Sequence, residues 1–168
     1  SLDVGYFNSL IIHLTLLPYI FASGEIKTKP TQHSVMKLRE IGLSPDFIFC
    51  RTSYEINQDI KDKLALFCNV KSDHVIENKD VSSIYEVPLL LEKQNITKMI
   101  CDRFQLNNKP SIKKLQNFVG TYKNPDHNVK IAMCGKYTEL YDAYKSITEA
   151  FVHAGVENNT TVEVVWVN

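Results

Sequence analysis

The sequence has no excess of either charge and no long hydrophobic run. Nineteen Lys and Arg residues balance nineteen Asp and Glu residues. No whole-protein field therefore attracts nucleic acid or an anionic membrane, and any anion site must be local. The longest apolar stretch, 10–20, contains His13, Thr15 and Pro18 and is too short to span a bilayer. No basic segment precedes it. We therefore expect no signal peptide, no membrane partner and no nucleic-acid partner.

Sequence motifs for metals, redox chemistry and phosphate loops are missing as well. The four cysteines form no C-x-x-C pair, and the five histidines show no H-E-x-x-H spacing, so we expect no metal site in this chain. Cys50, Cys68 and Cys134 lie in apolar runs, which predicts buried free thiols in a reducing compartment, the cytoplasm. The sequence also contains no G-x-x-x-x-G-K-[ST], no G-x-G-x-x-G and no nucleophile elbow.

Strand and helix patterns alternate along the first two thirds of the chain. With 44% hydrophobic and 23% charged residues, the composition is that of a globular protein. Pro30 is tolerated only in a first helical turn and Gly42 ends that helix, while Pro88 must kink or restart a later one. The patterns predict strands at 10–16, 47–51 and 74–76, and helices at 29–41, 56–67, 83–94 and 96–104.

A polar segment then separates a second run of elements. Residues 107–128 are rich in Asn and Lys, which predicts an interdomain linker, with one helix at 112–119. A strand at 129–134, a helix at 140–154 closed by Gly155 and a strand at 161–167 come next. The whole order predicts an α/β fold of parallel sheets with crossover helices. Because the last strand ends with the chain, we expect a protein cut at its C-terminus.

The best candidate binding site lies where the second predicted element begins. In an extended segment Lys27 and Lys29 point the same way, about 7 Å apart. The helix that begins there offers unpaired N–H groups and a positive dipole end. Thr28 and Thr31 add hydroxyls, and the Gln32 amide can read a base or ribose edge. Together these groups suit a polyphosphate; the alternative is an exposed Lys pair beside a capped helix.

Among the other polar positions, the residues alone favour a structural interpretation of Lys63 and of Asp80 or Ser82, and leave two interpretations of Arg51. Lys63 reads as a solvated helix lysine. Asp80 or Ser82 reads as the N-cap of the next helix. Arg51 leaves the second strand at its carboxyl end, where it could stack on a base or bind phosphate, or could lie on the surface.

Residues 24–35 (GEIKTKPTQHSV) resemble the signature of CTP synthase, the glutamine-dependent ligase family that aminates UTP. Several further segments agree with that family in order, and the resemblance covers roughly residues 11 to 168, whereas residues 1–10 do not match. These segments are 13–19 (HLTLLPY), 43–46 (LSPD) with Cys50 and Arg51, 64–70 (LALFCNV), 80–85 (DVSSIY) with Val87 and Pro88, and 135–146 (GKYTELYDAYKS).

The resemblance implies a two-domain enzyme. A synthetase (amidoligase) domain with a dethiobiotin-synthetase-like, P-loop NTPase-like fold uses MgATP to phosphorylate the 4-oxygen of UTP, and ammonia then displaces the phosphate. A class I glutaminase domain supplies the ammonia from glutamine, GTP activates it and CTP inhibits the synthetase. In this scheme residues 1–106 are the C-terminal part of the synthetase domain, 107–128 the linker and 129–168 the start of the glutaminase domain, within a homotetramer.

The resemblance also implies roles for single residues. Lys145, near the domain junction, would belong to the GTP-responsive coupling region. Lys79, Asp80 and Val81 would lie at the adenine of ATP, with Arg51 as a neighbour. The residues that would bind UTP or CTP are Lys27, Thr28, Lys29, Pro30, Thr31, Gln32 and, for the phosphates, Lys63.

Several parts of the family's machinery are not in these 168 residues. The phosphate loop, the Mg²⁺-binding acidic residues and the glutaminase Cys-His-Glu triad are missing. Cys134 is not the nucleophile, because it lacks the tight Gly-flanked turn that such a cysteine needs. We therefore expect no catalytic residue in this chain and no activity from it alone. An alternative is a non-catalytic assembly fragment; a general dethiobiotin-synthetase-like ligase is disfavoured by the segment 135–146.

Overall fold

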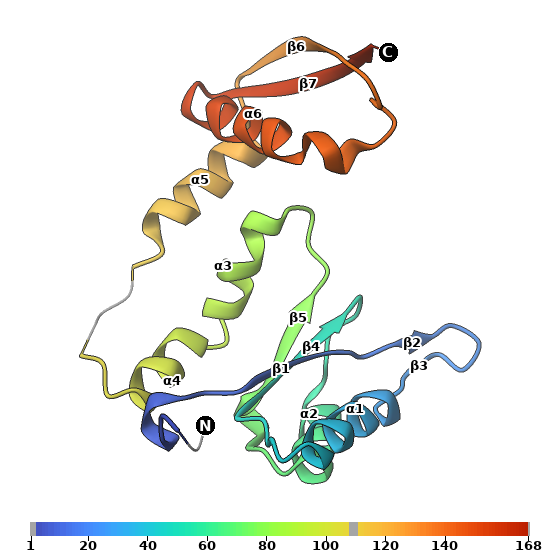
Figure 1. The fold of residues 1–168 in the computed structure, drawn as a ribbon, viewed down its shortest axis with the longest axis vertical. Helices are drawn as coiled ribbons and strands as arrows, with labels where there is room; N and C mark the ends of the chain where they lie inside the picture. The colour runs from blue at the N-terminus through green and yellow to red at the C-terminus, as the bar shows by residue number, and fades with distance from the viewer. Residues whose placement is uncertain (1–2, 108–110, 168) are drawn as a thin grey trace. The chain divides into compact units, whose positions relative to one another are not determined.

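The computed structural model describes residues 3–107 and 111–167, which form two compact units, Ser1–Pro110 and Ser111–Asn168. The first unit is built on a three-stranded sheet in the order β1-β4-β5, and both pairings are parallel (Figure 1). The sequence prediction of an α/β fold with parallel sheets is therefore confirmed. The strands are β1 (Ile12–Leu16), β4 (Phe47–Thr52) and β5 (Val75–Lys79).

Helices cover both faces of this sheet. Alternate residues of β4 point to opposite faces, so Ile48 packs with α1 and α2, whereas Phe47 packs with α3 and α4. Because β4 is the central strand and is buried on both faces, its sequence is mostly apolar. The helices are α1 (Lys29–Glu40), α2 (Gln58–Cys68), α3 (Val87–Glu92) and α4 (Ile96–Arg103).

Local sequence signals set the helix ends. Pro30 lies in the first turn of α1, as predicted, and Gly42, at φ +83°, comes just after its C-terminal end. The Asn57 side chain caps α2 by accepting a hydrogen bond from the Ile60 amide at 2.9 Å.

The helix predicted at 83–94 is divided at Pro88, which lies in the first turn of α3. Neither Asp80 nor Ser82 is the N-cap of this helical segment. The Ser83 side chain caps it instead, accepting a hydrogen bond from the Tyr85 amide at the start of a 3₁₀ helix. The short 3₁₀ helices are η1 (Tyr6–Asn8), η2 (Ser72–His74), η3 (Ile84–Glu86) and η4 (Tyr141–Tyr144).

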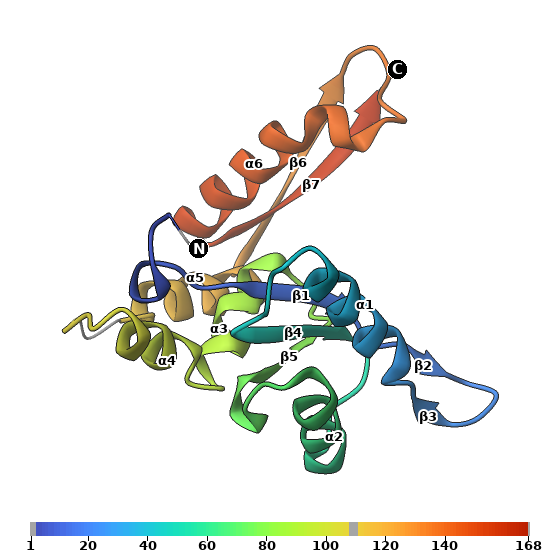
Figure 2. The same cartoon turned by 60° about the horizontal axis from the view of Figure 1, so that its bottom comes forward.

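The segment after β1 differs from the predicted loop. A small antiparallel hairpin, β2 (Tyr19–Ile20) and β3 (Glu25–Ile26), projects beyond the sheet (Figure 2). Lys27 to Lys29 is not extended, because Thr28 has helical backbone angles (φ −85°, ψ −21°) and Lys29 is the first residue of α1. The prediction that Lys27 and Lys29 point the same way from a strand is therefore wrong.

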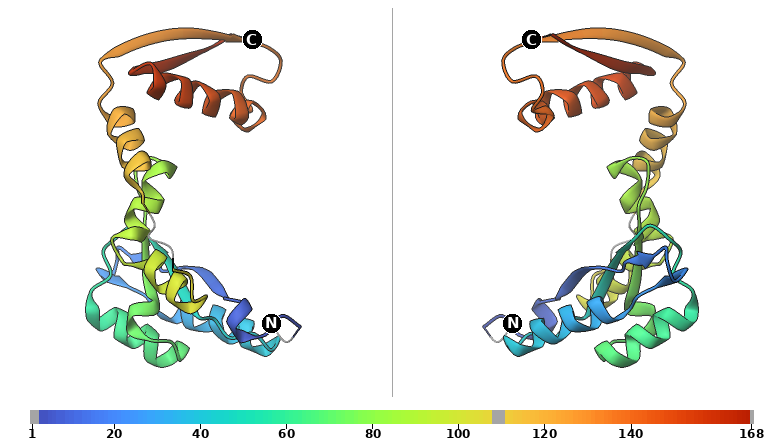
Figure 3. Two further views of the ribbon diagram at one scale, coloured as in Figure 1. Left: turned by 90° about the vertical axis from the view of Figure 1, so that its left-hand side faces the viewer. Right: turned by 90° about the vertical axis from the view of Figure 1, so that its right-hand side faces the viewer.

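The second unit is a βαβ arrangement with one additional helix. The two parallel strands carry α6 along one face (Figure 3), and α5 packs on α6 with the Phe118 and His153 rings 5.2 Å apart. Its elements are α5 (Lys113–Lys123), β6 (His127–Cys134), α6 (Lys145–Glu157) and β7 (Thr160–Val167). The predicted linker range 107–128 thus includes α5 and the first residues of β6, and its residues 108–110 lie outside the described residues.

Three predictions in this unit are wrong. Cys134 is exposed, because α6 covers only one face of the strand pair, whereas Cys50 and Cys68 are buried as expected. Gly155 does not end the helix but lies inside α6, where a Cβ would come within 2.4 Å of the Thr160 carbonyl oxygen. Glycine is required there by close packing of the helix on the next strand. The predicted start at residue 140 is also early, since residues 141–144 form η4.

None of the helices described in residues 3–107 and 111–167 is long and apolar enough to cross a membrane.

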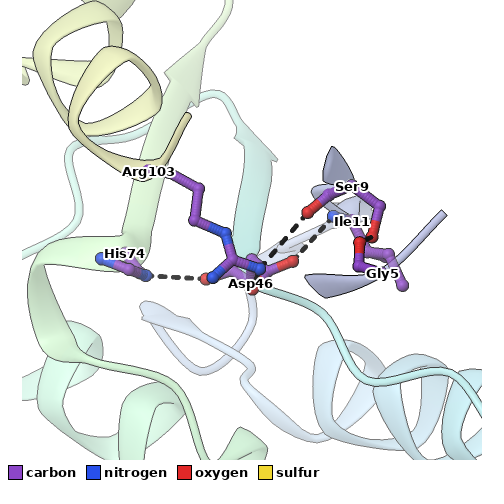
Figure 4. Close-up of polar contacts among 6 residues, drawn as sticks. All are labelled: Gly5, Ser9, Ile11, Asp46, His74 and Arg103. Atoms are coloured by element: carbon purple, nitrogen blue, oxygen red, sulfur yellow. Dashed lines mark hydrogen bonds and ion pairs between the residues drawn. The ribbon is translucent and has the colours of Figure 1, made fainter. Parts of the chain in front are cut away.

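The amino-terminal end of the first sheet is held by Asp46 (Figure 4). Its carboxylate accepts a hydrogen bond from the Ile11 amide at 2.8 Å and pairs with Arg103 at 3.5 Å. Arg103 also donates to the Ser9 carbonyl at 3.3 Å, and His74 donates from Nδ1 to the Asp46 carbonyl at 2.8 Å. This Asp46 hub joins the segment before β1, the loop before β4, the start of β5 and the end of α4.

We predict that Asp46→Ala lowers the unfolding free energy of the first unit by about 2–3 kcal/mol. The change removes the carboxylate that pairs with Arg103, whose side chain is only 13% exposed, and leaves its charge uncompensated. Hydrogen exchange of the slowest amides in β4 measures the effect. Asp102→Ala is the matched control, because its pair with Lys98 is exposed and is worth about 0.5 kcal/mol. Equal losses in the two variants would contradict the role given to Asp46.

Candidate functional site

The carboxyl ends of the three parallel strands meet at one edge of the sheet, where open α/β folds bind ligands. A cleft of 760 Å³ lies there, among the β2–β3 hairpin, the loop after β4 and the first turns of α2. Three of the predicted site residues line it: Thr28, Lys63 and Lys79. The other lining residues are Tyr19, Gly24, Glu25, Ile26, Tyr54, Glu55, Asn57, Asp59 and Ile60.

Stacked aromatic rings form one wall of the cleft. The Tyr19 and Tyr54 ring centroids lie 4.0 Å apart at an interplanar angle of 29°. This contact joins the hairpin to the loop after β4. Phe21 packs edge-on against Tyr19 at 5.3 Å, while 82% of its own surface remains exposed. The sequence analysis did not predict either tyrosine as a site residue. One local feature could have indicated Tyr54: it lies two residues beyond the end of a strand.

Positive and negative side chains face each other in the cleft. Lys63 enters from α2 and Lys79 from the end of β5, where it lies 3.6 Å from Glu55. Lys27 does not line the cleft, but it forms an ion pair with Glu25, which does. The hydrogen bond and the charge of Lys27 hold the pKa of the Glu25 carboxyl below its usual value. If a polyanion bound in the cleft, its oxygens would replace these carboxylates as the partners of the lysines.

The residues from Thr28 to Gln32 divide among the cleft, the protein interior and the exposed surface. Thr31 is fully buried and donates to the Leu16 carbonyl at 3.1 Å. Gln32 donates from its side-chain amide to the Thr28 hydroxyl at 3.1 Å, and Thr28 is itself 6% exposed. Lys29 and Pro30 are exposed at the start of α1 and do not line the cleft. The hydroxyls of Thr28 and Thr31 therefore stabilise the first turn of α1 in this structure.

A second polar group lies beside the cleft, where β4 and β5 end. Asp80 accepts hydrogen bonds from the Ser53 hydroxyl at 2.8 Å and from Arg51 Nε at 3.4 Å. These contacts hold the pKa of Asp80 below its usual value, the Ser53 bond first and the Arg51 bond and charge after it. The structure thus brings together three predicted residues, Arg51, Lys79 and Asp80, while Val81 is the next residue in the loop. Ser53 was missed by the sequence reasoning.

The described residues, 3–107 and 111–167, hold no group of three or more His, Cys, Asp or Glu side chains that could bind a metal ion. Glu25, Glu55 and Asp59 line the cleft without forming such a group. The Mg²⁺ that the resemblance implies is therefore not assigned to residues of this chain.

Lys145 lies in the second unit, at the first position of α6. It pairs with Glu149 one turn later at 2.6 Å, and the hydrogen bond and charge of Glu149 raise the pKa of Lys145. Such a pair stabilises the helix surface. Cys134 is exposed at the end of β6, in the same unit.

We predict that Tyr54→Leu loosens the β2–β3 hairpin without unfolding the sheet. Two strands of two residues are only marginally stable by themselves, and the Tyr19–Tyr54 stack contributes about 1 kcal/mol beyond its buried area. The Lys27 amide donates to the Pro18 carbonyl at 2.9 Å across the hairpin, so its exchange should rise about fivefold, the factor that corresponds to this energy, while exchange in β4 stays unchanged. Unchanged exchange at Lys27 would show that the hairpin does not depend on the stack.

Comparison with known proteins identifies relatives along the whole chain. A family model described as CTP synthase N-terminus matches residues 1–106. The CTP synthase of a Hydrogenobaculum species is 50% identical over 169 residues, covering 100% of this chain and 32% of the relative. The CTP synthase of Methanocaldococcus jannaschii is 50% identical over 167 residues, covering 99% of this chain and 31% of the relative.

The chain spans about a third of the length of the curated relatives it matches. The similarity includes the first ten residues, so the expectation that the resemblance begins near residue 11 is wrong. The family model ends at residue 106, while the similarity to the full-length relatives continues to the end of the chain.

Proposed function

Because the chain belongs to the CTP synthase family, we propose that it is part of an enzyme that aminates UTP to CTP with ATP and with ammonia from glutamine. Residues 1–106 are then the C-terminal part of the synthetase domain, and 129–168 the start of the glutaminase domain. The family model that ends at residue 106 and the two compact units support this division.

The observation that carries the proposal is the convergence of Thr28, Lys63 and Lys79 on one cleft at the carboxyl ends of the sheet. Lys63 and Lys79 come from different elements, so the fold, and not one sequence motif, brings their charges together. Ammonium groups neutralise phosphate oxygens and form charge-assisted hydrogen bonds with them. The cleft therefore suits triphosphates, with UTP or CTP on the side of α1 and α2.

We assign the adenine of ATP to the side of the cleft where β4 and β5 end. There Lys79, Asp80 and Val81 are consecutive, and Arg51 lies 3.4 Å from Asp80. The Asp80 carboxylate can accept from a base amino group, and the guanidinium plane of Arg51 can stack on a base. When ATP is bound it supplies the phosphoryl group that activates the UTP 4-oxygen. The residues of this chain bind and orient the two nucleotides.

We further propose that the whole enzyme forms a homotetramer and that GTP acts through the region of Lys145. The first proposal is supported by apolar side chains on the surfaces of α1 and α2, among them Met36 (55% exposed), Leu66 (79%) and Phe67 (58%). The same surface favours the second candidate function, a non-catalytic assembly fragment. Size-exclusion chromatography with and without UTP or CTP separates the two, since association that ignores nucleotide favours assembly alone.

We predict that Lys63→Ala weakens UTP or CTP binding by about 1.5–3 kcal/mol, the range for charge-assisted hydrogen bonds. Lys27→Ala and Lys29→Ala are expected to fall in the same range, through the phosphates that reach the start of α1. Calorimetric titration of the chain with CTP measures each variant. Lys61→Ala is the control, because Lys61 is on the same helix but lines a different cavity. Unchanged CTP affinity in Lys63→Ala would contradict the site.

We predict that the purified 168-residue chain neither releases ammonia from glutamine nor makes CTP. The sequence supplies no phosphate loop and no Cys-His-Glu triad, and the exposed Cys134 lies on a plain strand end. A coupled ammonia assay checks the first part and chromatography of nucleotides the second. Turnover above that of a Cys134→Ala chain would overturn the prediction.

A further inference from the structure

Three contacts hold Asp80 in one orientation beside the cleft. Its backbone amide donates to the Thr52 carbonyl at 2.9 Å, which extends the pairing of β4 and β5 by one residue. One carboxylate oxygen then accepts from the Ser53 hydroxyl at 2.8 Å, and the other lies 3.4 Å from Arg51 Nε. Both the backbone and the side chain of Asp80 are thus fixed by the residues that end β4.

The Ser53 bond is the shorter of the two side-chain contacts. Arg51 carries a full charge, but its side chain is 67% exposed and its contact is at the limit of hydrogen-bond distance. The other charged groups nearby, Lys79 and Glu55, pair with each other at 3.6 Å and do not contact Asp80. The orientation of the Asp80 carboxylate therefore depends mainly on the Ser53 hydroxyl.

Asp80 is ionised at neutral pH, as an ordinary aspartate is, and these contacts lower its pKa further. A lowered pKa means that the carboxyl has lost its proton well below neutral pH. An ionised carboxylate only accepts hydrogen bonds. Whatever base edge lies against Asp80 must therefore offer an N–H group.

We propose that Ser53 is a positioning residue that aims the Asp80 carboxylate and thereby selects a purine with a 6-amino group over one with a 6-carbonyl group. This inference rests on the proposed ATP site. At position 6 an amino group donates a hydrogen bond to the aimed carboxylate, whereas a carbonyl oxygen turns its own lone pairs toward the carboxylate and is repelled. Without Ser53 the carboxylate can rotate about its side-chain bonds, so the aimed acceptor, and with it the discrimination, is lost.

The experiment compares Ser53→Ala with Ser53→Thr, which keeps a hydroxyl at the same position. In the 168-residue chain without nucleotide, NMR titration of the Asp80 side-chain carboxyl should give a higher pKa in Ser53→Ala and the original pKa in Ser53→Thr. Calorimetry should show ATP affinity reduced about two- to tenfold in Ser53→Ala, the worth of one hydrogen bond, with the affinity for inosine triphosphate unchanged or raised, because the carboxylate no longer repels its 6-carbonyl group.

Ser82→Ala is the matched control. Ser82 is a nearby exposed serine whose hydroxyl donates to Glu86, so its loss should change neither the Asp80 titration nor the ratio of the two affinities. An unchanged Asp80 titration in Ser53→Ala, or equal losses of affinity for ATP and inosine triphosphate, would overturn the role of Ser53. Absence of ATP binding by the unaltered chain would instead contradict the proposed ATP site, and the titration would still decide whether Ser53 holds Asp80.

Discussion

The first unit depends on the position of β4 between two parallel neighbours. β4 is hydrogen-bonded to β1 on one edge and to β5 on the other, and Phe47, Ile48 and Cys50 on its two faces are at most 2% exposed. Because the core on each face is built around this strand, its direction and its end points are fixed. The position of the loop after β4 is therefore fixed as well. Arg51, Ser53 and Tyr54 lie at the end of β4 or just beyond it.

The polar side chains at the two ends of the parallel sheet differ in their contacts and exposure. At the amino-terminal end the Asp46 hub joins four segments through hydrogen bonds and one largely buried ion pair, which closes that end of the sheet. At the carboxyl-terminal end the chain turns outward into the hairpin and the loops, and polar side chains remain partly exposed around the cleft. Structural polar groups are thus concentrated at one end and the groups of the proposed nucleotide site at the other, which is the end where open parallel α/β sheets generally bind ligands.

Local patterns in the sequence predicted most of the helices and strands, because caps, prolines and apolar periodicity act within a few residues. They also pointed to Thr28, whereas a role for Lys63 came only from the resemblance to CTP synthase; the fold brings both residues to one cleft. The Tyr19–Tyr54 stack and the Ser53–Asp80 bond join residues 35 and 27 positions apart. No local signal encodes such pairs. Cys134 shows another limit. An apolar strand pattern predicts burial, but it does not predict whether helices cover one face of the strand or both.

The proposed function requires the cleft at the carboxyl ends of β1, β4 and β5 to bind nucleoside triphosphates. Amide chemical-shift mapping of the chain with UTP and, separately, with ATP tests this requirement. We expect UTP to shift the amides of Thr28 and Lys63, and ATP to shift those of Lys79, Asp80 and Val81. Shifts confined to residues 111–168, or no shifts at millimolar nucleotide, would contradict it.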